Sequence, residues 1–78
     1  MLYEWRLYES VYVRALPGYS GKIPLGKQIS CGHIELEQYP QVGDYLEVEL
    51  NPDRKSLLKV ERIVHSEGHP TRLDCVDD

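Results

Sequence analysis

The 78-residue sequence contains no phenylalanine, one tryptophan, one methionine and two cysteines. Two cysteines are too few for a disulfide scaffold, so the chain has to fold around a hydrophobic core. No stretch approaches the roughly 20 consecutive apolar residues that a membrane-spanning helix needs, and we expect no membrane partner. The length leaves room for one core, which predicts a single domain over residues 1–78.

Two further absences bear on location and activity. Glu4 and Arg6 interrupt the kind of apolar run that a signal peptide requires, so we expect a cytoplasmic protein with reduced thiols. The sequence lacks a nucleophile elbow, an H-E-x-x-H motif and a pair of acids in an apolar setting. We therefore expect no enzymatic activity.

Charge is unevenly distributed along the chain. There are 9 basic and 13 acidic residues, which give a net charge of −4 at pH 7. No acid occurs between Ser10 and Ile34, whereas residues 35–53 hold six acids and no base. An acidic protein is repelled by a phosphate backbone, which counts against nucleic-acid binding unless the basic residues gather on one face.

Apolar and polar residues alternate with a period of two, which predicts β-strands. The first strand covers residues 3–15 with a bend at Glu9–Ser10, and its odd-numbered face is apolar. In the second, over residues 28–38, the apolar face changes from odd to even positions across Gly32–His33. One extra residue shifts the parity of a strand, so we predict a β-bulge at this glycine.

Turn signals separate three further strands. A turn over residues 39–44 precedes a strand over 45–50, and a hairpin loop over 51–55 leads to a strand over 57–64. After a further turn over residues 66–70, a last strand covers 71–76. Five strands without a helix predict an all-β protein, a small five-stranded meandering barrel. The succession of turn, Val42-Gly43-Asp44, strand, hairpin and strand resembles that of SH3-like barrels. The resemblance implies an architecture and no functional residue.

Five residues have the chemistry of zinc ligands: Cys31, His33, His65, His69 and Cys75. Their spacing matches no standard zinc finger, in which cysteines are separated by short gaps. The preferred interpretation is that both cysteines are small core residues and the histidines lie on turns, so we expect no metal and no cofactor. A disulfide between the two cysteines is the alternative for an exported protein.

The aromatic residues point to a binding surface. Six tyrosines accompany the one tryptophan, and tyrosine suits half-wet recognition surfaces better than a core. Residues 17–27 form the longest irregular stretch, and long loops are often functional. The residues that we expect to contact a partner lie on the predicted first strand and in this loop: Tyr8, Tyr12, Arg14, Tyr19, Lys22 and Lys27.

We therefore expect a non-enzymatic protein-binding module, an accessory, adaptor or inhibitor subunit of a larger assembly. Exposed edge strands also allow partner binding or homo-oligomerisation by strand addition. The first alternative is a small barrel that binds single-stranded nucleic acid through the same tyrosines and basic residues. The second is a zinc-stabilised structural module.

Overall fold

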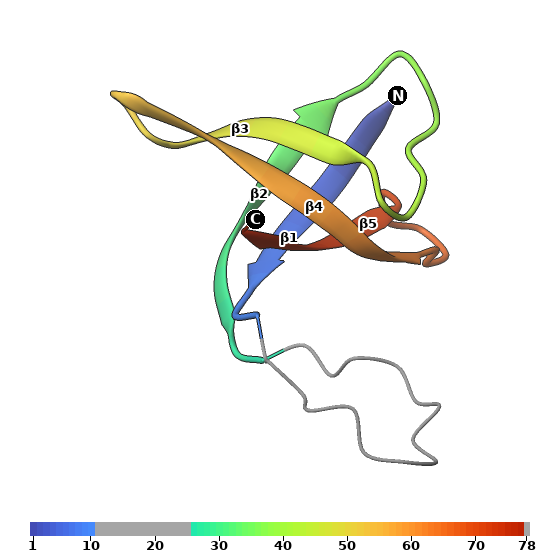
Figure 1. Ribbon diagram of the computed structural model, residues 1–78. Coiled ribbons are helices and arrows are strands. Elements are labelled where there is room, and N and C mark those ends of the chain that lie inside the picture. The colour runs from blue at the N-terminus through green and yellow to red at the C-terminus, as the bar shows by residue number, and fades with distance from the viewer. Residues whose placement is uncertain (11–25, 78) are drawn as a thin grey trace, which may run out of the picture.

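Five strands in one sheet make up the regular structure of residues 1–10 and 26–77, the part of the chain that the computed structural model describes. The strands are β1 (Leu2–Tyr8), β2 (Gln28–Glu35), β3 (Tyr45–Asn51), β4 (Arg54–Val64) and β5 (Arg72–Asp77) (Figure 1). The described residues contain no helix, and the sheet curls strongly into a half-barrel. The predicted all-β class is confirmed.

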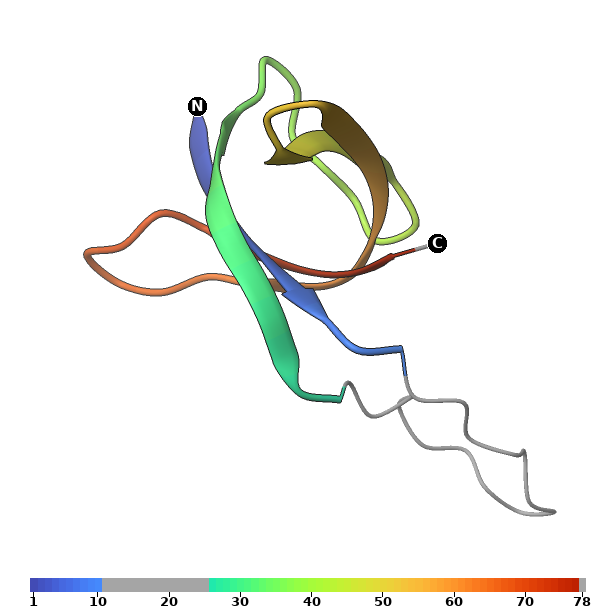
Figure 2. The same ribbon diagram turned by 90° about the vertical axis from the view of Figure 1, so that its left-hand side faces the viewer.

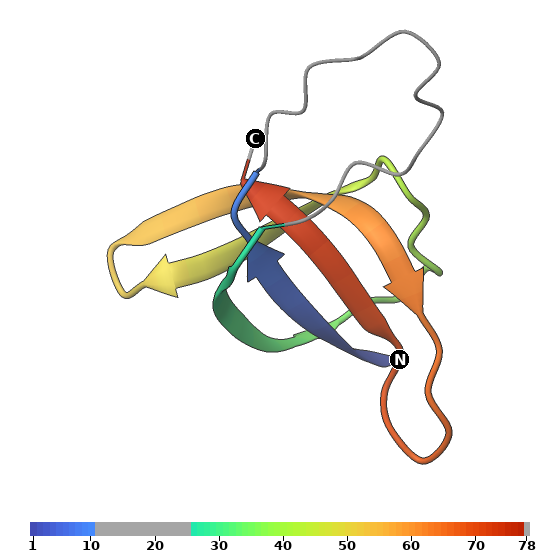
Figure 3. The ribbon, with the colours of Figure 1, turned by 90° about the horizontal axis from the view of Figure 1, so that it is seen from below.

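The strands follow the order β2-β1-β5-β4-β3 in the sheet (Figure 3). β1 and β5 run parallel, and every other pair of neighbours is antiparallel. A five-stranded meander requires this arrangement, because its first and last strands point the same way when they meet. The sheet does not close into a complete barrel, because β2 and β3 are its two edges and do not pair with each other. Figure 2 looks into the curl between them.

The core fills the concave side of the curl. Alternate residues point inward, as the period of two predicts, except where the register shifts at the start of β2 and between Val60 and Arg62 of β4. The buried cluster comprises Tyr3, Trp5, Leu7, Leu46, Val48, Leu58, Val60, Leu73 and Cys75. Two glycines with positive φ end the turns that precede β3 and β5: Gly43 at 98° and Gly68 at 78°. Side chains rarely adopt this backbone conformation, so glycine fits both positions.

The predicted bulge at Gly32–His33 is wrong. The β1–β2 register runs without a break past Gly32, and shifts where Tyr8 pairs with Gln28, so that Ile29 is the extra residue. Ile29 is 60% exposed, and Cys31 is exposed too. From Ser30 onward, the even-numbered side of β2 therefore faces inward. The prediction was wrong because it assumed that Ile29 and Cys31 are buried, which made the inward-facing side of the strand seem to change from odd to even positions.

Gly32 makes room for the one tryptophan of the chain. It pairs with Trp5 across the β1–β2 ladder, and the indole lies against it so closely that an added Cβ would be 2.6 Å from Trp5 Cζ2. Real side chains do not tolerate that approach. The glycine is thus a packing requirement and not a bulge.

Other boundaries differ slightly from the prediction. The hairpin loop expected over residues 51–55 shrinks to a turn at Pro52–Asp53, because β4 already begins at Arg54. Residues 11–15 of the predicted first strand, and residues 17–25 of the predicted loop, lie outside the described residues.

We predict that Gly32→Ala lowers the free energy of unfolding by about 1–3 kcal/mol, the range for overpacking a core. The measurement is urea unfolding followed by far-ultraviolet circular dichroism. Cys31→Ala, at the exposed neighbouring position, should change stability by less than about 0.5 kcal/mol. In a Trp5→Phe background, Gly32→Ala should cost less, because the phenyl ring is smaller than the indole. Equal costs in both backgrounds would mean that the contact is unimportant.

Candidate functional site

The expected partner-binding residues lie mostly outside the described part of the chain. Tyr12, Arg14, Tyr19 and Lys22 are all within residues 11–25, and their interpretation stays a prediction. Tyr8 is half-buried at the end of β1, and Lys27 is exposed just before β2. The two segments that carry them are joined by backbone hydrogen bonds, from Glu9 N to Lys27 O at 2.9 Å and from Gly26 N to Glu9 O at 3.0 Å.

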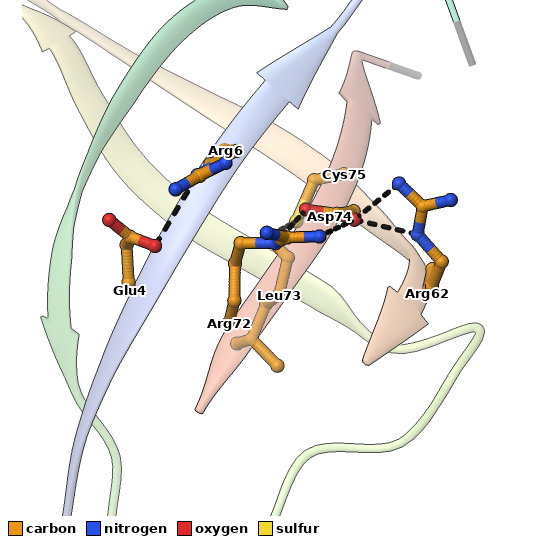
Figure 4. A network of polar contacts seen from close by, with 7 residues as sticks. All are labelled: Glu4, Arg6, Arg62, Arg72, Leu73, Asp74 and Cys75. Carbon is orange, nitrogen blue, oxygen red and sulfur yellow. Dashed lines mark hydrogen bonds and ion pairs between the residues drawn. The ribbon is translucent and has the colours of Figure 1, made fainter. Parts of the chain in front are cut away.

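A buried carboxylate lies on the convex face of the sheet. Asp74, on β5, is 0% exposed and is opposite Arg6 of β1 and Arg62 of β4 in the strand register. Arg62 Nε donates to Asp74 Oδ2 at 2.7 Å, and Arg72 Nε donates to Oδ1 at 2.9 Å (Figure 4). Each carboxylate oxygen therefore accepts a charge-assisted hydrogen bond, which is what a buried charge requires.

The third arginine of this face is also engaged. Arg6 Nε lies 3.3 Å from Glu4 Oε2 (Figure 4). A side-chain hydrogen bond with Tyr8, followed by the charges of Glu4 and Asp74, holds the pKa of Arg6 above its usual value against the opposing effect of burial. The convex face thus has paired charges across β1, β5 and β4. It has the character of a structural network more than of an open anion site.

The five candidate zinc ligands do not come together. Cys31 and His33 are exposed on the outer side of β2, whereas Cys75 is in the core on β5. Across residues 1–10 and 26–77, no group of three or more histidine, cysteine or acidic side chains is placed to hold a metal. Both cysteines are free, and Cys31 is not the core residue that we expected. The expectation that the histidines lie on turns is wrong for His33, which lies within β2. His69 lies on the exposed turn between β4 and β5.

His65 has a different role, with a tyrosine that sequence reasoning missed. Tyr39 Oη is 2.8 Å from His65 Nε2, and the two rings stack with an interplanar angle of 15°. His65 Nδ1 is 3.2 Å from Thr71 Oγ1. Tyr39 also meets Tyr3 edge to face, with ring centroids 6.4 Å apart. These contacts connect the segment between β2 and β3 to the end of β4.

The open side of the half-barrel is hollowed. We call the strip between residues 31–35 of β2 and residues 45–49 of β3 the β2–β3 seam. A hollow of about 450 Å³ lies between the middle parts of the two strands, with Trp5 among its lining residues. A second hollow, of about 500 Å³, lies where β2 ends and β3 begins, beside residues 36–40. Together the two hollows follow the seam from one end to the other.

The seam combines an apolar interior with an acidic rim. Leu46 and Val48 of β3 point inward, as do Gly32 and Ile34 of β2. Lysine and arginine are absent from the residues that line the two hollows, whereas five acids are present: Glu35, Glu37, Asp44, Glu47 and Glu49. The acidic stretch of the sequence is thus concentrated along one groove. The alternation of apolar and polar residues predicted the strands on both sides of this groove. Nothing in the local sequence indicated that β2 and β3 would be the two edges of the sheet and face each other.

Comparison with protein family models, with curated proteins and with solved structures finds no match for this chain. No helix among the described residues is long and apolar enough to cross a membrane.

We predict that Asp74 needs its arginines. The double substitution Arg62→Met and Arg72→Met leaves a buried carboxylate without partners and should lower stability by about 3–5 kcal/mol. Adding Asp74→Leu removes the uncompensated charge and should restore most of the loss, as read by urea unfolding. Arg54→Met, at an exposed arginine of the same strand, is the matched control and should have an effect below about 0.5 kcal/mol. A double variant as stable as that control would refute the role of the network.

Stability should fall in alkali because of Cys75. Burial, and then the charges of Asp74 and Glu61, raise the pKa of this thiol from 9.0 to about 12. The unfolded chain loses the proton at lower pH than the folded one, so rising pH favours unfolding by about 1.4 kcal/mol per pH unit between these two values. Subtracting the urea-unfolding profile of Cys75→Val isolates this slope from other alkaline titrations. Cys31→Val should leave the slope unchanged; a flat difference profile for Cys75→Val would show that burial does not shift this thiol.

Proposed function

We propose that the chain is a non-enzymatic protein-binding module that takes an extended segment of its partner into the β2–β3 seam. The observation that carries the proposal is that the barrel is not closed: β2 and β3 are both sheet edges, and two hollows lie between them. An edge strand presents backbone N–H and C=O groups to an incoming strand. Pairing with such groups is the common mode of strand addition.

The directions of the strands define how a segment would enter. β2 is antiparallel to β1, whereas β3 points the same way as β1, since it is reached through parallel β5 and antiparallel β4. A strand between β2 and β3 is therefore parallel to one of them and antiparallel to the other. It would complete a barrel of six strands, in which every edge is paired.

Side chains near the seam favour a protein partner. Tyr39, Val42 and Tyr45, in or next to the connection from β2 to β3, are 56%, 61% and 53% exposed. Tyrosine with apolar neighbours is typical of recognition surfaces. Among the described residues, single-stranded nucleic acid has less support, because acids line the seam and the convex-face arginines already pair with Asp74 and Glu4. An accessory or adaptor role in a larger assembly agrees with a small domain of this kind.

A selection from a phage-displayed library of random twelve-residue peptides tests the proposal. Cys31 lies at the seam and is exposed, whereas Cys75 is buried and its pKa is raised, so a bulky maleimide labels Cys31 selectively. We expect selected peptides to bind the unlabelled protein and to bind the Cys31 adduct at least about tenfold more weakly. Nuclear magnetic resonance should show slower amide exchange on both seam strands when peptide is bound.

The matched control carries the same adduct on the convex face. Lys59 is on that face of β4, with 40% of its side chain exposed, and Cys31→Ser with Lys59→Cys moves the label there. This adduct should leave peptide binding unchanged. If both adducts block binding equally, if neither does, or if the library yields no seam-dependent peptide, the proposal fails.

A further inference from the structure

The two walls of the seam present side chains in the same alternating pattern. On β3, Leu46 and Val48 are buried, while Tyr45, Glu47 and Glu49 are exposed on the outer side. On β2, Gly32 and Ile34 face inward, and Cys31, His33 and Glu35 face outward. Side chains of an added strand alternate in the same way, so every second one meets the apolar interior and the others meet the outer rows of both walls.

The outer rows carry an excess of negative charge. Glu47 has Lys55 Nζ at 3.7 Å from Oε1, an exposed pair in which 65% of the lysine and 61% of the glutamate side chain are accessible. Such exposed pairs are weak, so a basic side chain of an incoming strand can compete with this lysine for Glu47. Glu35 lies 2.8 Å from the α-amino group of Met1. Among the described residues, Glu49 has no ion-pair partner.

We propose that the segment bound in the seam alternates basic and apolar residues: lysine or arginine on the outer side, between Glu35 and the glutamates of β3, and small apolar residues on the inner side, above Trp5. This inference rests on the proposed function and names the chemistry of its partner. Opposite charges on neighbouring strands stabilise a sheet, and like charges destabilise it. The acidic rim therefore selects a basic segment by attraction and rejects an acidic one by repulsion.

The same charges disfavour a second copy of this chain as the occupant. An edge-to-edge pair of β3 strands would bring Glu47 and Glu49 of one copy next to those of the other. Charged residues on edge strands protect against this kind of self-association. A basic partner relieves the repulsion, whereas a second copy increases it.

Two synthetic ten-residue peptides test the charge preference. Both carry valine at every second position; one has lysine and arginine between the valines, and the other has glutamate there. Binding is measured by isothermal titration calorimetry on the full chain at low salt, with sedimentation velocity to detect dimers. We expect the basic peptide to bind at least about tenfold more tightly than the acidic one, and its affinity to fall as salt rises.

Charge variants locate the effect. Glu47→Gln with Glu49→Gln should weaken the basic peptide about tenfold and bring the two peptides closer in affinity. Asp53→Asn with Glu67→Gln is the control: it makes the same change in net charge at exposed turn positions and should leave the preference intact.

The outcomes separate the two proposals. If peptides bind at the seam, as shown by loss of affinity in the Cys31 adduct, but basic and acidic peptides bind alike, the charge preference is wrong and the proposed function stands. If the control variant reduces affinity as much as the seam variant, the preference reflects net charge and the inference also fails. If the adduct has no effect on any peptide, or if the protein forms a seam-dependent dimer in place of a peptide complex, both proposals fail.

Discussion

The contact between Trp5 and Gly32 is the constraint on which the arrangement of β1, β2 and the seam depends. The indole needs space that no side chain larger than hydrogen leaves free, since an added Cβ would approach it to 2.6 Å. With glycine opposite, the ring lies across the β1–β2 ladder and remains 5% exposed. It fills the concave side below β2 and lines one of the hollows between β2 and β3. One residue thus belongs to the core and to the candidate site.

The opposite side of the sheet is held by charge. β5 is central, with Leu73 and Cys75 buried on its concave side and Asp74 buried on its convex side. The carboxylate accepts hydrogen bonds from Arg62 on β4 and Arg72 on β5, in a face that also contains Arg6 of β1. Removing the partners of a buried charge is costly, so the network ties β4 and β5 together on this face. The edge strands β2 and β3 lie at the two ends of the strand order and contribute no residue to this network.

Local patterns allow much of the fold to be predicted. The strands near residues 45–50, 57–64 and 71–76 follow from alternation and from turns at Gly43 and Gly68, because a period of two reflects the pleat directly. The bulge could not be placed in this way. Alternation assumes that apolar residues are buried, and Ile29 and Cys31 are exposed. Tyr39 and His65, 26 residues apart, also carry no local signal of their contact.

The acidic stretch shows why the site needs the structure. In the sequence, the six acids between Glu35 and Asp53 count against nucleic-acid binding and suggest little else. In the fold, five of these residues line hollows between two strands that do not pair with each other. Which edges face each other is set by the parallel β1–β5 pairing, between segments that are far apart in the chain. Once that pairing leaves β2 and β3 open, their alternating side chains define both an apolar and a charged row, and hence the chemistry that a bound strand would need.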